Sequence, residues 1–312
     1  MTSRRGTLVR GRRHLGHACR WVARLFIVAL VAGSPTRVAL AQDLAATAAF
    51  LDLGLGARTM AMGGASVAVV DGAAALRDNP AGLAQLRGLH FTSFYSTEYG
   101  LSSLGAAALA APSFGLGATY FLSPDNQVRD DPPAPASDTF DVTSLAATAG
   151  VGARLGPLAL GVSLTHVRHA LYQTTGTGLT GSAGLLLQAG PLRVGVVGRH
   201  LFGEMTYAST ADPFDPVYAA GFALMGREFV VTGEYEVPGS EDRSGGIARA
   251  GLEVRLGRLL DLRAGAAYQV AQDLLDPSAG IGIHLGGLRL DYAYTLPAVL
   301  PETHRLALAV RF

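Results

Sequence analysis

The chain is unusual in lacking lysine and in having almost no cysteine or tryptophan. The 312-residue chain has no lysine, one cysteine (Cys19) and one tryptophan (Trp21), and both single residues precede residue 42. That region has the pattern of an export signal, so the mature chain is expected to contain neither. A chain without cysteine excludes a disulfide framework, even in an oxidising compartment. Cys19 precedes the apolar run of the signal, a position that argues against a lipid anchor.

Charge is scarce and long apolar runs are missing. Only 16% of residues are charged and 49% are hydrophobic, whereas soluble domains carry roughly 25% charged residues. No run of about 18 uncharged apolar residues occurs, which excludes the usual helical membrane span. The other structure that satisfies its backbone within lipid is a closed β-barrel.

The N-terminus has the three parts of a secretory signal. Basic residues precede the apolar run LFIVALVA at 25–32, and Ala39-Leu40-Ala41 forms a small-x-small cleavage site before Gln42. We therefore predict a cleavable signal over residues 1–41. Eight of the 25 basic residues lie there, which leaves 17 arginines against 24 acidic residues and a net charge of −7. An acidic mature chain argues against nucleic-acid binding.

From Gly88 to the end, the apolar period is two residues, which predicts β-strands. In LALGVSLT at 158–165, large apolar residues alternate with Ala, Gly, Ser and Thr. A soluble sandwich would also have an apolar face, but it would place Lys, Glu and Thr on the other one. Segments of about ten residues with this pattern are typical of tilted membrane strands. The fourteen predicted strands are 88–97, 101–110, 114–123, 142–155, 157–170, 179–189, 192–202, 216–226, 228–237, 246–256, 259–270, 277–285, 287–296 and 303–312.

The connections between these strands alternate between short and long. Except at 98–100, each short turn is followed by a longer loop, at 124–141, 171–178, 203–215, 238–245, 271–276 and 297–302. Short periplasmic turns and longer outer loops are the pattern of outer-membrane barrels. The loops collect acids: Asp125, Asp130, Asp131, Asp138, Asp141, Glu204, Asp212, Asp215, Glu241, Asp242, Asp273 and Asp276. The short-turn side collects arginines: Arg87, Arg154, Arg193, Arg227, Arg258, Arg289 and Arg311.

The segment FLDLGLGARTMAMGGASVAVVDGAAALRDNPAGLA at 50–84 has a different character, because it is rich in small residues and nearly uncharged. Residues 65–70 favour a short strand. Asp71 is a helix N-cap for residues 72–77, and Asn79 followed by Pro80 repeats the device. Small residues allow packing in a confined space. We predict an all-β fold: a signal peptide (1–41), a helical, Gly-rich plug or hatch (42–87), and a 14-stranded antiparallel transmembrane barrel (88–312).

The same segment resembles the N-terminal signature of the PorV/PorQ family, which is related to FadL-like transporters. The resemblance rests on GAR at 56–58, MGGA at 62–65 and NPAGL at 79–83. It implies an outer-membrane barrel with an N-terminal hatch that transports hydrophobic small molecules or assists protein secretion. The implied partners are outer-membrane lipid, the barrel-assembly machinery, and hydrophobic molecules or secreted proteins. Over the strands, the resemblance is one of architecture alone.

Several residues of the hatch are candidates for a functional role. Arg58 lies in an apolar stretch and needs a carboxylate, since a buried charge must be paired; Glu253, Asp261 and Asp291 are the expected partners. The Asn79-Pro80-Ala81 motif either shapes a hatch that rearranges or simply starts a helix, and we favour the structural role. The predicted hatch residues are Arg58, Gly63, Gly64, Asp71, Asn79, Pro80, Ala81 and Gly82.

Other sites have weaker support. His166 and His169 fall on opposite faces of a strand, which disfavours a metal site, and the acids of 124–141 lack the spacing of a known calcium loop. No nucleophile elbow, phosphate loop or zinc spacing occurs. We therefore expect no cofactor, no metal and no enzymatic activity. A barrel esterase and a purely structural or adhesive barrel remain alternatives. The terminal Phe312 on an alternating strand resembles the assembly signal of outer-membrane barrels.

Overall fold

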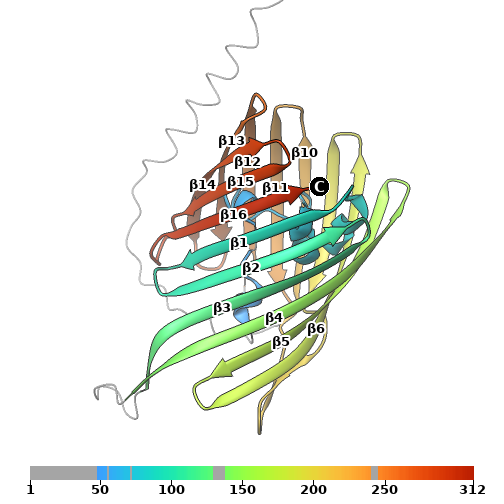
Figure 1. Ribbon diagram of the computed structural model, residues 1–312. Helices are drawn as coiled ribbons and strands as arrows, with labels where there is room; N and C mark the ends of the chain where they lie inside the picture. Colours follow the sequence, from blue (N-terminus) through green and yellow to red (C-terminus); the bar gives the residue numbers. More distant parts are fainter. Residues whose placement is uncertain (1–47, 55, 71, 129–137, 240–244) are drawn as a thin grey trace, which may run out of the picture. The chain divides into compact units, whose positions relative to one another are not determined.

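The computed structural model describes residues 48–54, 56–70, 72–128, 138–239 and 245–312. Sixteen strands belong to one sheet, and fourteen of them form the wall of a barrel (Figure 1). The wall strands are β1 (His90–Glu98), β2 (Ser102–Ala111), β3 (Phe114–Val128), β4 (Asp138–Leu155), β5 (Leu158–Leu171), β6 (Thr174–Ala189), β7 (Leu192–Arg199), β10 (Val217–Met225), β11 (Phe229–Pro238), β12 (Ile247–Leu256), β13 (Leu260–Gln269), β14 (Leu274–Leu285), β15 (Leu288–Thr295) and β16 (Thr303–Arg311).

The sheet closes on itself. Each wall strand pairs antiparallel with its neighbours in sequence, β7 pairs with β10, and the first strand pairs with the last from His90↔Arg311 to Thr97↔His304. Closure removes free strand edges, which a sheet in lipid requires. The predicted 14-stranded antiparallel barrel is confirmed, and every predicted wall strand overlaps an observed one.

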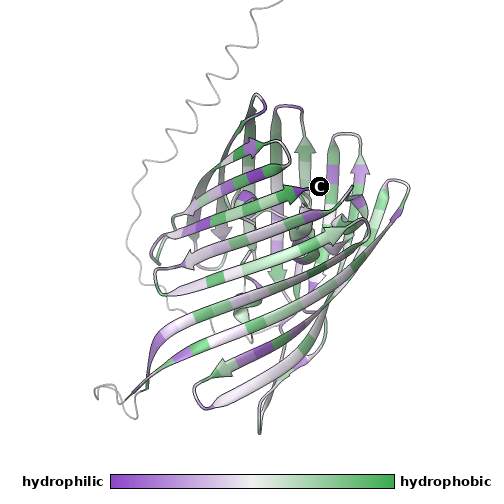
Figure 2. Ribbon diagram, in the orientation of Figure 1, coloured by the Kyte–Doolittle hydropathy of each residue, from purple (hydrophilic) through white to green (hydrophobic). Residues whose placement is uncertain are grey.

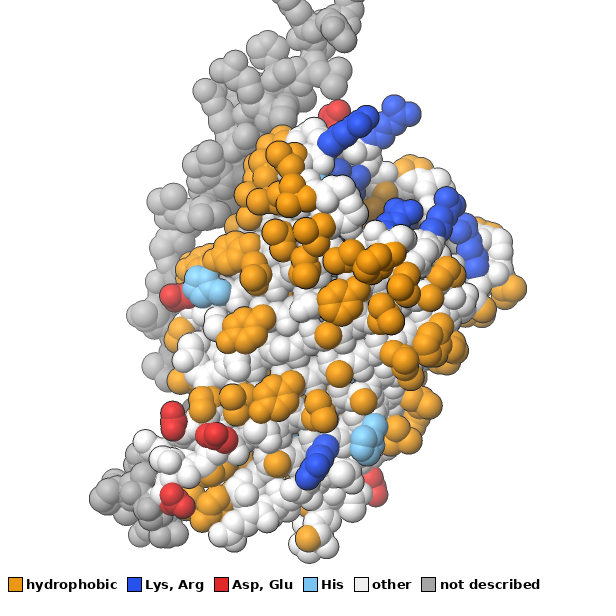
Figure 3. Space-filling view, in the orientation of Figure 1, with side chains coloured by type: hydrophobic (Ala, Val, Ile, Leu, Met, Phe, Trp, Pro, Cys, Tyr) orange, Lys and Arg blue, Asp and Glu red, His pale blue; other side chains and the backbone are white. Residues whose placement is uncertain are grey.

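The outer face of the wall is apolar. On β5, Ala159 points inward with 1% of its surface exposed, whereas Val162 points outward with 54% exposed. The same alternation leaves a belt of exposed Leu, Val, Phe and Tyr side chains around the strands (Figures 2 and 3). An apolar surface of this extent faces lipid rather than water.

Short helical pieces occupy the N-terminal segment. They are η2 (Ala49–Leu51), α2 (Ala57–Met60), η3 (Gly72–Ala74), α3 (Ala75–Asp78) and η4 (Pro80–Gln85). None of the helices in the described residues is long and apolar enough to cross a membrane. Residues 65–70 form turns, so the predicted strand there is wrong. The backbone amides of Ser66 and Val67 donate to a wall carboxylate instead of to a partner strand.

One predicted long loop does not exist. Residues 171–178 belong mostly to β5 and β6, which are joined by a two-residue turn at Tyr172–Gln173. The polar, Gly-rich run TTGTG at 174–178 lacks an apolar alternation. It nevertheless pairs along β5 up to Leu171↔Thr174. Backbone pairing therefore extends beyond the apolar alternation from which the strands were predicted. The loop at 124–141 is shortened for the same reason, because β3 continues to Val128 and β4 starts at Asp138.

The predicted loop 203–215 contains a hairpin of two short strands, β8 (Glu204–Thr206) and β9 (Ala211–Pro213). Its first strand pairs with β6 through Thr177↔Thr206 and Gly178↔Met205. Several predictions fall outside the described residues: the signal peptide at 1–41, the cap at Asp71, and the loop acids Asp130, Asp131, Glu241 and Asp242.

The lipid-facing assignment makes a stability prediction. Val162→Arg places a charge on the outer face near the middle of β5 and is expected to destabilise the folded barrel by about 2–4 kcal/mol. Val162→Leu is the control and should change stability little. Urea unfolding of each variant in lipid bilayers measures the difference. Equal stability of the two variants would contradict a lipid-facing position for this side chain.

Candidate functional site

Residues 48–86, called the plug below, lie inside the barrel against the wall (Figure 1). The contact is closest where the wall carries glycine. A Cβ added to Gly161 of β5 would lie 2.2 Å from the carbonyl carbon of Pro80, and one added to Gly265 of β13 would lie 2.2 Å from that of Met62. A side chain at either position would overlap the plug backbone. The small residues on the inner face therefore make room for the plug.

The Asn79-Pro80-Ala81 motif ties two parts of the plug to the wall. The Asn79 Oδ1 atom accepts from the Ala81 amide at 3.1 Å and so caps η4, with Pro80 at the first helical position. Its Nδ2 atom donates to the carbonyl oxygens of Val67 (3.0 Å) and Leu185 of β6 (3.1 Å). Asn79 is fully buried. The Asn79 side chain thus caps η4 and also links two segments of the plug to β6.

Gly63 lies where the plug meets the opposite part of the wall. Its φ of +74° is a left-handed conformation that favours glycine. A Cβ there would lie 2.3 Å from the carbonyl oxygen of Ala266. Its amide donates to Ser278 Oγ on β14 at 3.0 Å. Gly64 continues the same turn with a φ of +80°, and Gly82 packs against Val70 within the plug.

Arg58 is anchored by Glu253 of β12, one of its three expected partners. Arg58 Nε lies 2.7 Å from Glu253 Oε2, and Arg58 Nη2 lies 2.9 Å from Glu253 Oε1, a two-bond pairing. Both side chains are buried, at 9% and 1% exposure. A buried charge left without its partner costs about 3–5 kcal/mol. This pairing is therefore a strong attachment of the plug to the barrel.

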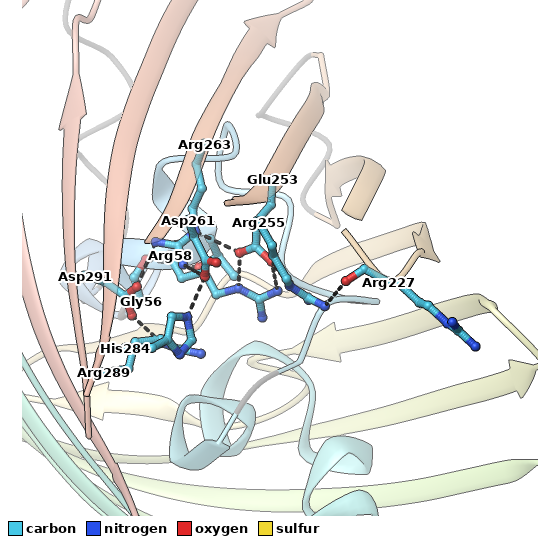
Figure 4. Close-up of polar contacts among 11 residues, drawn as sticks. Gly56, Arg58, Arg227, Glu253, Arg255, Asp261, Arg263, His284, Arg289 and Asp291 are labelled. Atoms are coloured by element: carbon cyan, nitrogen blue, oxygen red, sulfur yellow. Dashed lines mark hydrogen bonds and ion pairs between the residues drawn. The ribbon is translucent and has the colours of Figure 1, made fainter. Parts of the chain in front are cut away.

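Glu253 belongs to a larger ion cluster on β12–β15 (Figure 4). Arg263 of β13, with a fully buried side chain, connects Glu253 (2.8 Å), Asp261 (2.9 Å) and Asp291 (2.7 Å). Arg289 pairs with Asp291 at 2.7 Å, and His284 lies 2.7 Å from Asp261. All three expected partners of Arg58 are therefore in one network, and Arg263 pairs with each of them.

A second network holds the middle of the plug. Glu234 Oε2 of β11 accepts from the backbone amides of Ser66 (2.7 Å) and Val67 (2.8 Å). The neighbouring carboxylate of Glu236 pairs with Arg249 at 3.0 Å and also with Arg199. The plug amides that lack a strand partner are thereby satisfied by a charged acceptor.

The start of the plug carries a third polar group. Asp52 lies 3.3 Å from the ring of His200. Burial raises the pKa of Asp52, but His200 and the charges of Arg199 and Arg77 outweigh it and hold the pKa below its ordinary value. Burial lowers the pKa of Arg77 to about 10, against the opposing effect of Asp52 and Asp78. Arg77 also donates to the carbonyl of Leu51.

The lumen on the loop side is apolar. Plug residues Phe50 and Leu51 belong to a buried cluster whose wall members include Leu104 and Val167, near the loop ends of β2 and β5. Met205 of β8 and Phe214, which follows β9, close it from the loop side. The ring of Phe50 stacks on that of Phe121 at 6.0 Å between centroids.

Two neighbouring cavities lie at the opposite end, the short-turn mouth, where the turns at 112–113, 156–157 and 190–191 gather. One, of about 280 Å³, lies between the plug and β1, β15 and β16. The other, of about 540 Å³, is called the basic cavity below. The two share six lining residues and are therefore contiguous: Arg58, Gly72, His90, His284, Arg289 and Arg311.

The remaining sequence candidates lie apart from this site. His166 points outward from β5, whereas His169 is half-buried, with its Nδ1 atom 3.0 Å from Ser144 Oγ. Phe312 is 74% exposed, and its amide donates to the Leu89 carbonyl at 2.9 Å. Sequence reasoning missed Arg263 and Glu234. Their position in the sequence was the available signal, because each is a charged residue on the inward-facing side of a strand whose outward-facing residues are apolar.

Comparisons with solved structures identify the fold. The TodX deltaS2S3 mutant monoaromatic hydrocarbon channel superposes with a TM-score of 0.54 at 14% identity, covering 83% of this chain and 98% of that one. The KdgM porin (TM-score 0.39, 8% identity, 72% of this chain and 99% of that one) and a mutant Rh. blastica porin (0.37, 7%, 72% and 99%) are more distant. The chain therefore shares its barrel fold with this hydrocarbon channel. No family model and no curated protein matches it, so the PorV/PorQ resemblance stays a prediction.

The anchoring role of Glu253 can be tested by proteolysis. Glu253→Gln removes the charge that pairs with Arg58, Arg255 and Arg263, and it is expected to loosen the plug because three cations lose a partner. Trypsin should then cleave after Arg58 at least about tenfold faster. Glu302→Gln, at an exposed loop position, is the control. Equal cleavage rates in both variants would show that Glu253 does not hold the plug.

The Asn79 motif gives a second prediction. Asn79→Ala combined with Pro80→Ala removes the cap, the two carbonyl contacts and the fixed helix start, so the plug should open more often. Increased conductance in planar bilayers and faster proteolysis of residues 50–84 are expected. A matched double variant outside the plug, Asn126→Ala with Pro301→Ala, should behave as wild type. Unchanged conductance and protection would refute the role of the motif.

Proposed function

We propose that this protein is a non-enzymatic outer-membrane channel that carries hydrophobic small molecules past a movable plug. The apolar outer belt suits an outer-membrane location, and the short-turn mouth then faces the periplasm. The fold is shared with a monoaromatic hydrocarbon channel, TodX. Small aromatic hydrocarbons are therefore the first ligands to test.

The apolar cluster on the loop side carries this proposal. Plug side chains, Phe50 above all, fill a lumen that is lined by Leu104, Val167 and Phe121. A hydrocarbon that displaced Phe50 would exchange one apolar contact for another, at little cost in desolvation. The contents of the lumen thus match the proposed cargo.

Passage requires the plug to move, since it fills the lumen between the apolar cluster and the short-turn mouth. The anchors of Arg58 lie on β12–β15, whereas the end of the plug packs on β4 and β5. We propose that the end of the plug moves while the Arg58 side stays fixed. Movement of residues 80–86 would connect the cluster with the contiguous cavities.

An engineered disulfide tests this movement, and the cysteine-free mature chain suits it. A Cβ at Gly152 of β4 would lie 3.3 Å from the Cβ of Ala84 and 2.9 Å from its backbone nitrogen. A small outward shift of the plug end relieves the second contact and brings the two Cβ atoms to the spacing of roughly 3.5–4.5 Å found in disulfides. Ala84→Cys with Gly152→Cys should therefore lock the end of the plug. We expect toluene uptake by cells producing the wild type, loss of uptake in the oxidised double variant, and recovery after reduction.

Each single-cysteine variant is the control and should take up toluene under both conditions. Absence of toluene uptake by the wild type would overturn hydrocarbon transport itself. Equal uptake by the oxidised and reduced double variant would overturn only the movement of the plug end.

Protein secretion is a second candidate, favoured by the PorV/PorQ-like residues of the plug. Co-purification of secreted proteins or secretion components with the barrel would support it, as would a secretion defect without loss of hydrocarbon uptake. Hydrolysis of lipid esters by the purified protein would contradict the non-enzymatic assignment.

A further inference from the structure

The basic cavity at the short-turn mouth is lined by arginine to an unusual degree. One of its arginines, Arg58, comes from the plug, one, Arg87, from the link between the plug and β1, and five from the ends of wall strands that are distant in sequence. Among the described residues, the acids that line it are Glu253 and Asp261. Hydrophobic transport does not account for this concentration of charge. The seven arginines are Arg58, Arg87, Arg154, Arg193, Arg255, Arg289 and Arg311.

Three of these arginines are paired with carboxylates. Arg58 and Arg255 both pair with Glu253, and Arg289 pairs with Asp291. Three others differ: within the described part of the chain, no acidic side chain pairs with Arg87, Arg154 or Arg311. Arg154 donates to the Gly156 carbonyl at 2.9 Å.

The charge is also unusual for the molecule as a whole. The predicted mature chain has a net charge of −7. In Figure 3, basic side chains gather at the end where the C-terminus lies, and most of the visible acidic side chains lie toward the other end. A concave wall on which one sign of charge predominates focuses its field and raises the local concentration of the opposite ion. The short-turn mouth is thus arranged to attract anions.

The cavity has the size of a small-molecule site. Its volume of about 540 Å³ lies within the roughly 300–1,000 Å³ of such sites. Plug residues Val69, Val70 and Leu86 contribute to its lining. Guanidinium groups bind carboxylate and phosphate through paired hydrogen bonds, and more effectively than ammonium groups do. The basic residues that line the cavity are arginines, together with His90 and His284.

We propose that the basic cavity binds a free, multiply charged oxyanion, a small phosphate or polycarboxylate, with Arg87, Arg154 and Arg311 as its principal ligands. The strand pairing of β15, β16 and β1 is continuous beside the cavity, up to His90↔Arg311. This wall separates the cavity from lipid headgroups, which favours a dissolved anion as the source. The site is independent of the proposed hydrocarbon cargo.

Calorimetry of the full mature barrel in phosphatidylcholine nanodiscs tests the site, with inorganic pyrophosphate and citrate as probes. One saturable site per barrel is expected, with an affinity that falls as salt rises. The variant Arg87→Gln/Arg154→Gln/Arg311→Gln should bind roughly tenfold or more weakly, since charge-assisted hydrogen bonds are lost. Heat-modifiable migration verifies that the variant still forms the barrel.

The matched control is Arg168→Gln/Arg227→Gln/Arg258→Gln, which removes the same charge from exposed positions outside the cavity lining. It should bind both probes within about threefold of the wild type, because exposed charges at a distance are screened. Equal weakening in the two triple variants, or no binding by the wild type, would overturn the proposal. Competition by phosphatidylglycerol nanodiscs would instead identify a lipid headgroup as the ligand and overturn the assignment to a dissolved anion.

Discussion

The structure depends on one buried carboxylate. Glu253 receives Arg58 from the plug and Arg263 from the neighbouring strand, and both of these cations are buried. Taking charges out of water is costly, so each member of the cluster is stable only while the others remain in place. Arg263 extends the constraint to Asp261 and Asp291. One side of the plug is thereby fixed to four consecutive wall strands.

The other side of the plug is held by different forces. Asn79 contributes hydrogen bonds to backbone carbonyls, and glycines such as Gly161 and Gly184 allow the plug to approach the wall backbone. These contacts are numerous but uncharged, and each is worth about 1 kcal/mol. The contrast between a charged anchor and a packed, neutral end provides a physical basis for a hatch that moves at one end and stays attached at the other.

The two ends of the lumen suit different chemistry. The loop side is filled with apolar side chains, including Phe50 against Phe121, and the short-turn mouth is lined by arginine. A hydrocarbon gains contacts in the first region and an oxyanion in the second. Because the plug lies between them, any change in its position alters both. In the proposed function, movement of the plug would therefore couple the entry of a hydrocarbon on the loop side to the binding of an anion at the short-turn mouth.

The sequence by itself determined the barrel, because an alternation of large apolar with small residues every second position has no other stable arrangement in lipid. It also limited the partners of Arg58 to three carboxylates, since a buried charge must be paired. Only the tertiary structure decided that Glu253 is the partner, that Arg263 takes the other two, and that Glu234 satisfies plug amides. Strand register and closure bring these residues together, and no local pattern encodes a contact across 195 residues of chain.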